Sequence, residues 1–407
     1  MRKILLVFAA LGLSFNLNAQ TTVTDSVSIL PGYANQAWYS LENGQAGTAP
    51  KNNWDLAFEI SMFGTSIHIN SVAGVRLWTY PNGDTSDFLS IDTSGFSSWT
   101  AQYNTDTYWN VGAFDVNADP ADPFDVGWGI YNMVNHVITG DSLFVIRLRD
   151  STYRQLHVMN LASGSYNLRW ANLDGTGLQN MSVLKSSFAG KNFGYLNIQS
   201  NATLDREPAS DSWDLLFTQY TGFVPAPYNV VGILTNRGIQ TAKVSNVGDP
   251  ATFDDWSSQS FDSLINVIGY DWKTFNGMAF EIQDSLVYFL KNADEEVWKL
   301  VLTGFGGSAT GTFKFNKTLL SVTGASDKQM EKDVMVFPNP SNGDFQILTS
   351  RNGQLEIALY DLSGKRVWQR EISSDGFSLH SISCPVAPGM YILTAGGKVQ
   401  PGKVVIY

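Results

Sequence analysis

The sequence predicts an all-β protein built from several antiparallel modules. Of its 407 residues, 13% are aromatic, only 15% are charged, and 36 are glycine. Aromatic residues favour strands, and glycines favour the turns that join them. Apolar and polar residues also alternate with a period of two, for example from Phe144 to Arg149, as they do in half-buried strands. No window has the spacing of a long amphipathic helix, so we expect tandem antiparallel β modules.

The N-terminus has the three parts of a secretory signal peptide. Arg2 and Lys3 precede a short apolar run from Ile4 to Leu13, and the small residue Ala19 offers a cleavage site. This run is too short to span a bilayer, and no later segment reaches roughly 18 apolar residues. We therefore expect removal of residues 1–19 during export, and no transmembrane segment. No cysteine stands directly after the apolar run, which argues against a lipoprotein anchor.

The charge balance excludes one class of partner. The formal net charge is -11 and no run of lysine and arginine occurs, whereas nucleic-acid binding depends on neutralising phosphates. Acidity of this kind keeps a protein soluble outside a cell. The single cysteine, Cys384, cannot form an internal disulfide, and we interpret it as a buried core residue.

The chain contains an internal duplication. The run Asn53-Trp54-Asp55-Leu56-Ala57-Phe58 recurs 159 residues later as Ser212-Trp213-Asp214-Leu215-Leu216-Phe217. An aromatic strand and a polar turn precede each run. Asp141-Ser142-Leu143-Phe144-Val145 likewise recurs 143 residues later as Asp284-Ser285-Leu286-Val287-Tyr288. Repeats at such a spacing predict two copies of one module.

These boundaries give the predicted domain organisation. It comprises a signal peptide at 1–19, a first module at 20–182, a second module at 183–323, a linker at 324–332 and a C-terminal domain at 333–407.

The two spacings differ by 16 residues, so the first copy has an insertion. The best candidate is the acidic, proline-bearing stretch from Asp115 to Asp125, which we expect to be an exposed loop. Asp115, Asn117 and Asp119 alternate there in a way that suits the oxygen ligands of calcium. Pro120 stands where an EF-hand loop needs glycine. A solvated acidic loop is therefore the first interpretation, and a structural calcium site the second.

The last part of the chain contains four motifs in a fixed order. They are Phe337-Pro338-Asn339-Pro340, Leu359-Tyr360-Asp361-Leu362-Ser363-Gly364-Lys365, Pro388-Gly389-Met390-Tyr391 and Lys403-Val404-Val405-Ile406. Short strands between dense turns predict a small Ig-like β-sandwich. The segment resembles the type A sorting domain of the type IX secretion system of Bacteroidetes. This resemblance implies that residues 333–407 engage that secretion machinery, and that the protein reaches the cell surface or the medium.

The duplicated modules resemble the HmuY family of secreted haem-binding proteins. The resemblance lies in an aromatic strand, a polar turn, the Trp-Asp-Leu-x-Phe run, a later tryptophan and a closing strand pair. It implies a haem ligand, whose iron needs an axial donor such as histidine or methionine.

Histidines are scarce, and the second copy has none. His136 follows a predicted loop and His157 lies on a predicted strand, so these two are the candidate haem ligands. Met133 or Met159 are alternative donors. We interpret His68, in the middle of another strand, as an ordinary sheet residue.

No motif points to catalysis. The sequence has no Gly-x-Ser-x-Gly elbow and no His-x-x-x-His metal spacing, and nothing supports a carboxylate pair for glycoside cleavage. We therefore predict a non-enzymatic surface protein that binds haem or another small hydrophobic ligand. The alternative is a carbohydrate-binding or adhesion protein that uses some of its 12 tryptophans and 16 tyrosines as stacking surfaces.

Overall fold

The computed structural model describes residues 21–292, 295–321 and 334–407, the last range without residues 338, 350, 351, 363, 376, 377 and 397. The predicted signal peptide and linker lie outside the described residues. Strands make up 48% of the structure and helix 6%, which confirms the all-β class. Within the described ranges, no helix combines the length and the apolar composition needed to cross a bilayer.

The two modules form two bodies, which we call body 1 and body 2. The strands of body 1 are β4 (Leu56–Glu59), β5 (Ile67–Ile69), β6 (Arg76–Thr79), β7 (Gly129–Asn132), β8 (Val137–Gly140), β9 (Leu143–Arg147), β10 (Tyr153–Ala162), β11 (Ser165–Ala171), β12 (Gln179–Leu184), β13 (Phe193–Asn197) and β14 (Ala202–Leu204). The strands of body 2 are β1 (Thr22–Ser28), β2 (Asn35–Ser40), β3 (Gly44–Pro50), β15 (Leu215–Gly222), β16 (Tyr228–Thr235), β17 (Gln240–Val244), β18 (Lys273–Phe275), β19 (Phe280–Ile282), β20 (Val287–Lys291), β21 (Val297–Phe305) and β22 (Thr312–Ser321).

Helical segments are short. They are α1 (Gly307–Thr310) and the 3-10 turns η1 (Pro31–Tyr33), η2 (Ser71–Ala73), η3 (Thr85–Asp87), η4 (Phe96–Ser98), η5 (Lys185–Phe188) and η6 (Ser210–Ser212).

Both bodies are sandwiches with the same strand order. In body 1 a larger sheet contains the path β6-β9-β10-β11-β12, and a smaller one has the order β5-β4-β13-β14. In body 2 the matching sheets are β17-β20-β21-β22-β1 and β16-β15-β2-β3. Each body also has a separate apolar core between its two sheets. The repeated sequence motifs therefore correspond to a repeated fold.

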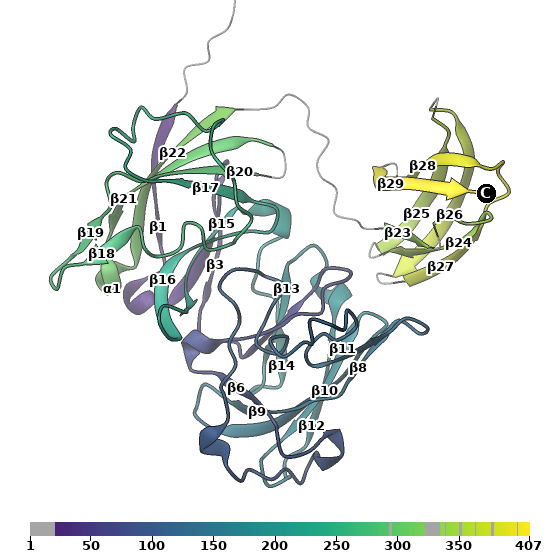
Figure 1. Cartoon of the computed structure of the whole chain (residues 1–407), viewed down its shortest axis with the longest axis horizontal. Coiled ribbons are helices and arrows are strands. Elements are labelled where there is room, and N and C mark those ends of the chain that lie inside the picture. The colour runs from purple at the N-terminus through teal and green to yellow at the C-terminus, as the bar shows by residue number, and fades with distance from the viewer. Residues whose placement is uncertain are drawn as a thin grey trace, which may run out of the picture.

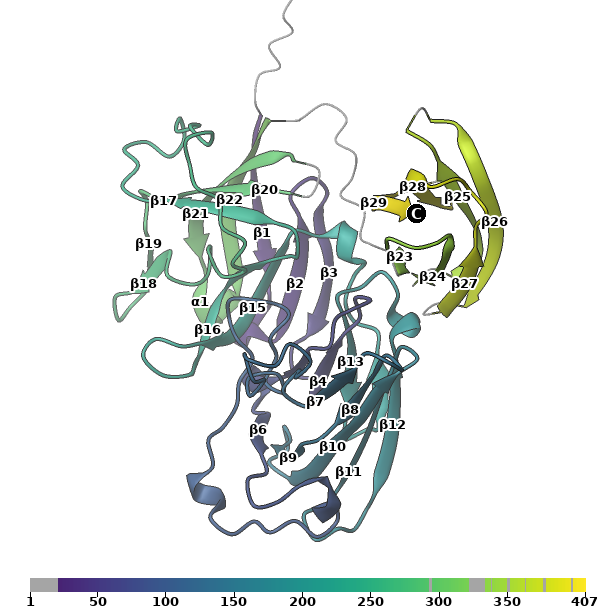
Figure 2. The same ribbon diagram turned by 45° about the vertical axis from the view of Figure 1, so that its right-hand side comes forward.

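The two bodies use interleaved parts of the chain. Strand β2 from the first copy pairs with β15 from the second, whereas β13 from the second copy pairs with β4 from the first. Likewise β1 pairs with β22, and β12 pairs with β11. Figures 1 and 2 show the result, because the purple N-terminal strands lie among the green strands of body 2.

This pairing corrects the predicted boundary between residues 182 and 183. Body 1 is one continuous stretch of chain from β4 to β14, and it is inserted between β3 and β15 of body 2. The correction has a physical basis, since backbone hydrogen bonds between strands define the sheets. The segments 20–182 and 183–323 are sequence repeats, but neither holds a complete pair of sheets.

The repeated Trp-Asp pair fixes the exchanged strands. The carboxylate of Asp55 accepts a hydrogen bond from the backbone N–H of Ile198 at 2.8 Å, just beyond β13. Asp214 does the same for the backbone N–H of Leu41 at 2.7 Å, just beyond β2. Each copy of the motif therefore holds the end of a strand contributed by the other copy.

The C-terminal part is a separate small sandwich, as its turn pattern predicts. A three-stranded sheet has the order β23-β24-β27, and a four-stranded sheet has the order β26-β25-β28-β29. The strands are β23 (Val334–Phe337), β24 (Asp344–Thr349), β25 (Asn352–Tyr360), β26 (Arg366–Asp375), β27 (Ser378–Ser383), β28 (Gly389–Ala395) and β29 (Lys398–Ile406). Cys384 is buried in the core between the two sheets, as expected.

Candidate functional site

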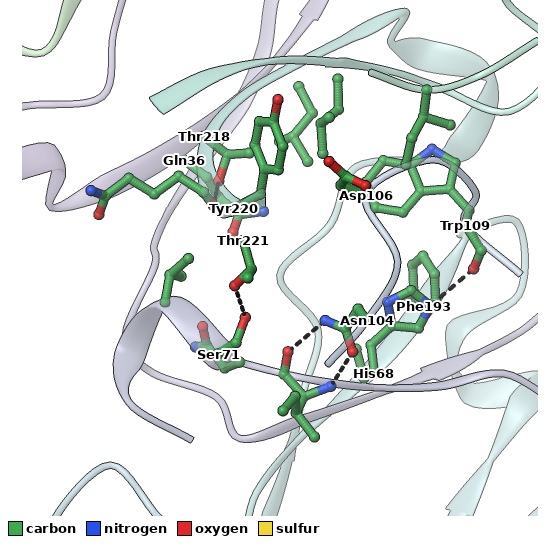
Figure 3. A pocket seen from close by; sticks show the side chains of 18 of the residues that line it. Gln36, His68, Ser71, Asn104, Asp106, Trp109, Phe193, Thr218, Tyr220 and Thr221 are labelled. Atoms are coloured by element: carbon green, nitrogen blue, oxygen red, sulfur yellow. Dashed lines mark hydrogen bonds between the residues drawn. The ribbon is translucent and has the colours of Figure 1, made fainter. Parts of the chain in front are cut away.

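A pocket of about 110 Å³ lies where the smaller sheets of the two bodies meet. Strands β4, β5 and β13 of body 1 line one part, and β2, β15 and β16 of body 2 line another. A loop of body 1 that includes Asn104 to Trp109 completes the wall (Figure 3). We call this the junction pocket.

The junction pocket follows from a size difference between equivalent residues. Ala57 in β4 corresponds to Leu216 in β15 within the repeated motif. Across the smaller sheets, the residues paired with these two form the columns Tyr195-Ala57-His68 in body 1 and Trp38-Leu216-Leu234 in body 2. Alanine fills less of the space between the sheets than leucine does. The repeat alignment already contained this signal, which sequence reasoning missed.

The loop that carries Asn104 is tied firmly to body 1. The Asn104 amide accepts from the backbone N–H of Ile69 at 2.9 Å and donates to the carbonyl of the same residue at 2.8 Å. Gly112 lets the returning chain pass close to β5, since a Cβ there would lie 2.1 Å from the carbonyl oxygen of Ile67. The wall is therefore held in one position.

The same loop also reaches body 2. The indole of Trp109 donates to the carbonyl of Thr235 at 2.8 Å, and the carbonyl of Thr107 accepts from the backbone N–H of Ile265 at 3.0 Å. Trp109 contacts apolar clusters of both bodies. The loop thus fixes the distance between the two bodies at the pocket.

A buried ion pair fastens the bodies beside the pocket. Arg237 of body 2 contacts the carboxylate of Glu59 in body 1 at 2.6 Å, and the Glu59 side chain is only 4% exposed. Nearby, the amide of Asn192 donates to the amide oxygen of Asn236 at 2.7 Å. Buried polar partners of this kind allow one relative arrangement of the bodies and disfavour others.

His68 lines the pocket as a neutral, engaged side chain. Its Nε2–H donates to the carbonyl oxygen of Trp109 at 2.9 Å, and its ring contacts the Phe193 ring edge-on at 4.9 Å between centroids. Burial lowers the pKa of His68 to about 4, so the imidazole carries no charge near neutral pH. His68 supports the loop and has no free Nε2 to act as an axial donor.

Asp106 supplies the charge of the pocket. Among the described lining residues it is the sole carboxylate, and none is lysine or arginine. The side chains of Trp109, Phe193 and Tyr220 line the same pocket, and Figure 3 shows Asp106 between Tyr220 and Trp109. Burial raises the pKa of Tyr220 far above its usual value, and the negative charge of Asp106 adds to that rise. Within the described part of the chain, the carboxylate of Asp106 has no hydrogen-bond or ion-pair partner.

The structure separates the two predicted haem ligands. His136 lies in the turn between β7 and β8, where its Nδ1 and the Tyr131 hydroxyl share a hydrogen bond of 2.7 Å. His157 is buried in β10, and its Nε2–H donates to the carbonyl of Gly140 at 3.4 Å. The register of β8 against β10 places their backbones on the order of 20 Å apart along the strands. These residues therefore do not face one common cavity.

The alternative methionine donors do not change this arrangement. Met133 is at the exposed tip of the β7–β8 hairpin, and Met159 lies on β10. Neither is among the residues that line the junction pocket.

The three candidate calcium ligands have different partners. The carboxylate of Asp115 is turned inward, accepting from the Ser66 hydroxyl at 2.7 Å, and burial raises its pKa well above the usual range. Asn117 donates to the Thr79 hydroxyl at 3.1 Å, and Asp119 caps the backbone N–H of Ala121 at 2.9 Å. Across the described ranges, no group of three or more His, Cys, Asp or Glu side chains is placed to hold a metal ion.

Comparisons with whole known proteins carry no argument about this chain. None of the curated proteins compared matches this sequence. Among solved structures, the crystal structure of dimeric latent PorU from Porphyromonas gingivalis matches with 10% identity and a TM-score of 0.16, covering 92% of this chain and 34% of that chain. The chain thus spans about a third of that protein's length, and so low a TM-score carries no argument.

One family model matches the C-terminal part. Residues 335–406 match the secretion system C-terminal sorting domain, which agrees with the four motifs and with the sandwich that they form. The match confirms the predicted sorting domain and implies an interaction with the secretion machinery. The chain therefore carries a secretion system C-terminal sorting domain, and it is a secreted or cell-surface protein.

Proposed function

We propose that this exported chain is a non-enzymatic binding protein that holds a small ligand in the junction pocket. The observation that supports this is a pocket at the contact between two duplicated bodies, lined by aromatic side chains, by amides and hydroxyls, and by one carboxylate without a described partner. The bodies are fixed to each other around it by the Glu59–Arg237 pair and by the Trp109 loop. A pre-formed, mostly apolar pocket with few polar groups is the usual form of a small-molecule site.

The lining chemistry favours binding over catalysis. Nucleophilic catalysis needs a nucleophile within hydrogen-bonding reach of a base. The histidine of the pocket is engaged by a backbone carbonyl, and the Thr221 hydroxyl is engaged by the Ser71 hydroxyl at 2.7 Å. These contacts position the walls of the pocket, and they engage the imidazole and this hydroxyl with partners other than each other.

The volume sets the size of the ligand. A cavity of roughly 150 Å³ holds one benzene molecule. At about 110 Å³ the junction pocket accommodates a smaller group, and a porphyrin ring does not fit inside it. The HmuY resemblance and a haem ligand stay predictions that concern other surfaces of the modules.

The variant Ala57→Leu tests this proposal by filling the pocket. Leucine is the residue that the equivalent position, 216, already holds, so the fold tolerates it in the second body. The matched control is Ala279→Leu, the same change at an exposed turn. We expect thermal-shift screening against small amines, neutral sugars, short-chain acids and hemin to find a class that stabilises the wild type and Ala279→Leu.

That stabilisation should be lost in Ala57→Leu, because the ligand and the leucine side chain compete for one space. If every ligand class that stabilises the wild type stabilises Ala57→Leu to the same extent, the junction pocket is not the binding site. A hemin response that persists in Ala57→Leu would support haem binding elsewhere on the modules.

A further inference from the structure

We infer that the junction pocket takes a compact organic cation, such as a quaternary ammonium or a protonated amine. This inference rests on the proposed function, since it names the ligand class of the same pocket. It is carried by the position of Asp106 between Trp109 and Tyr220 in a pocket lined by no lysine or arginine among the described residues.

The unpaired carboxylate sets the sign of the ligand charge. Asp106 is half-buried, so it has lost part of its hydration, and no described side chain or backbone N–H compensates for this loss. A cation in the pocket would supply the missing partner, whereas an anion would be repelled. The net charge of -11 adds a general attraction for cations in solution.

The aromatic side chains favour an organic cation over a metal ion. Indole and phenol rings attract ammonium groups through the negative faces of their π systems. A hard metal ion is usually held by several carboxylate oxygens, whereas this pocket has one carboxylate, and the described residues contain no group of three or more His, Cys, Asp or Glu side chains placed to hold a metal. The ring-rich wall therefore matches a cation that is itself partly apolar.

The size of the pocket fits the head of such a ligand. If roughly 150 Å³ holds the six carbons of benzene, a pocket of about 110 Å³ holds about four or five heavy atoms. A trimethylammonium group with its first methylene carbon is of this size. The rest of a longer ligand would extend beyond a pocket of this volume. A free amine and a lipid headgroup share this chemistry.

Titration calorimetry with the full mature chain tests the charge requirement. The probe is choline, and its control ligand is 3,3-dimethyl-1-butanol, which has the same shape without the charge. We expect choline to bind the wild type about tenfold or more tightly than the neutral alcohol. This comparison needs no variant, so it does not depend on the folding of a mutant.

Asp106→Asn locates the effect. We expect it to weaken choline binding by about tenfold or more while leaving the neutral alcohol unchanged. The matched control is Asp211→Asn, which removes an exposed carboxylate in η6 and should leave choline binding unchanged. Vesicles of phosphatidylcholine, compared with free choline, identify whether a headgroup or a soluble amine is preferred.

The outcomes separate this inference from the proposed function. If the alcohol binds as well as choline, or if Asp106→Asn has no effect, the cation assignment is wrong. The proposed function still stands in that case, provided that Ala57→Leu abolishes the binding. Binding of a neutral sugar alone, abolished by Ala57→Leu, leads to the same conclusion. If no probe binds, or if binding ignores Ala57→Leu, both proposals fail.

Discussion

The carboxylate of Asp214 accepts a hydrogen bond from the backbone N–H of Leu41 at 2.7 Å, across 173 residues of chain. Asp55 makes the equivalent bond to Ile198, but it also contacts the guanidinium of Arg149 at 2.7 Å. Among the described residues, no cation forms such an ion pair with Asp214. Burial accordingly raises the pKa of Asp214 to about 6.

The variant Asp214→Asn should therefore change how stability depends on pH. A carboxyl group with a raised pKa in the folded state binds its proton more tightly when folded, so its contribution is present below the unfolded pKa and is lost as pH rises through about 6. Asparagine keeps an acceptor for the Leu41 N–H and has no charge to bury. We expect Asp214→Asn to match the wild type near pH 4 and to exceed it by about 2 kcal/mol near pH 7. Urea unfolding at both pH values measures this difference, and an equal difference at the two values would contradict it.

Asp55→Asn should have the opposite effect at neutral pH. The Asp55 side chain is fully buried, and the substitution leaves the Arg149 guanidinium without its carboxylate. Breaking one partner of a buried pair costs about 3 kcal/mol. The control is Asp205→Asn, which removes an exposed partner of Lys191 and should cost less than about 1 kcal/mol. Similar losses of unfolding free energy in the two variants would show that the Asp55–Arg149 ion pair stabilises the fold no more than an exposed ion pair does.

The insertion of body 1 predicts which pieces of the chain fold. Residues 51–208 contain every strand of body 1, so this fragment should unfold cooperatively on its own. Residues 183–323, although they form one sequence repeat, lack β1, β2 and β3 and should not fold. Circular dichroism during heating distinguishes the two. A cooperative transition in the 183–323 fragment would mean that the exchanged strands are dispensable.

Gly112→Ala should loosen the wall of the junction pocket. A Cβ at residue 112 would lie 2.1 Å from the carbonyl oxygen of Ile67, so the backbone must move. We expect a loss of about 2 kcal/mol in unfolding free energy, together with weaker ligand binding. At Gly248 a Cβ would meet nothing within 4 Å, and Gly248→Ala is the matched control. Unfolding and binding are measured on both variants, and unchanged binding in Gly112→Ala would show that the loop does not shape the site.

Removal of the sorting domain should abolish export without altering the two bodies. A chain that ends at Thr323 keeps β1 to β22 but loses the segment that matches the sorting-domain family. We expect it to remain in the cell and to unfold at the same temperature as the two bodies in the full chain. Cell fractionation and thermal unfolding provide the two readouts, and undiminished external protein would refute the export role of residues 335–406.

Sequence patterns predicted the elements better than their pairing. The alternation around Phe144 predicted a strand that the structure contains, and the C-terminal motifs predicted both a sandwich and its sorting role. The exchange of strands β2 and β13 between the two copies was not predictable. Trp38 in β2 and Tyr195 in β13 precede equivalent motifs, so the sequence suits pairing of either strand with either β4 or β15. Local patterns encode which face of a strand is apolar, but not which copy completes the sheet.

The site was harder to predict for a related reason. The pocket is formed by residues from six strands, from the η2 turn and from several separate loops, which only the folded chain brings together. His136 and His157 were predicted as haem ligands because histidine is a common iron ligand, yet the β8–β10 register separates them. The informative position was Ala57, where a small residue replaces the leucine of the other copy.

The insertion of body 1 into body 2 also determines the order in which the two bodies can fold. Body 1 has all its strands once residue 204 has been made, whereas β1 and the hairpin of β2 and β3 lack their partner strands β22 and β15 until the rest of body 2 follows. Bringing such distant segments together is slow compared with forming local hairpins. The amino-terminal strands, though the first to be made, therefore lack β15 and β22 while body 1 folds, and they are among the last to join complete sheets.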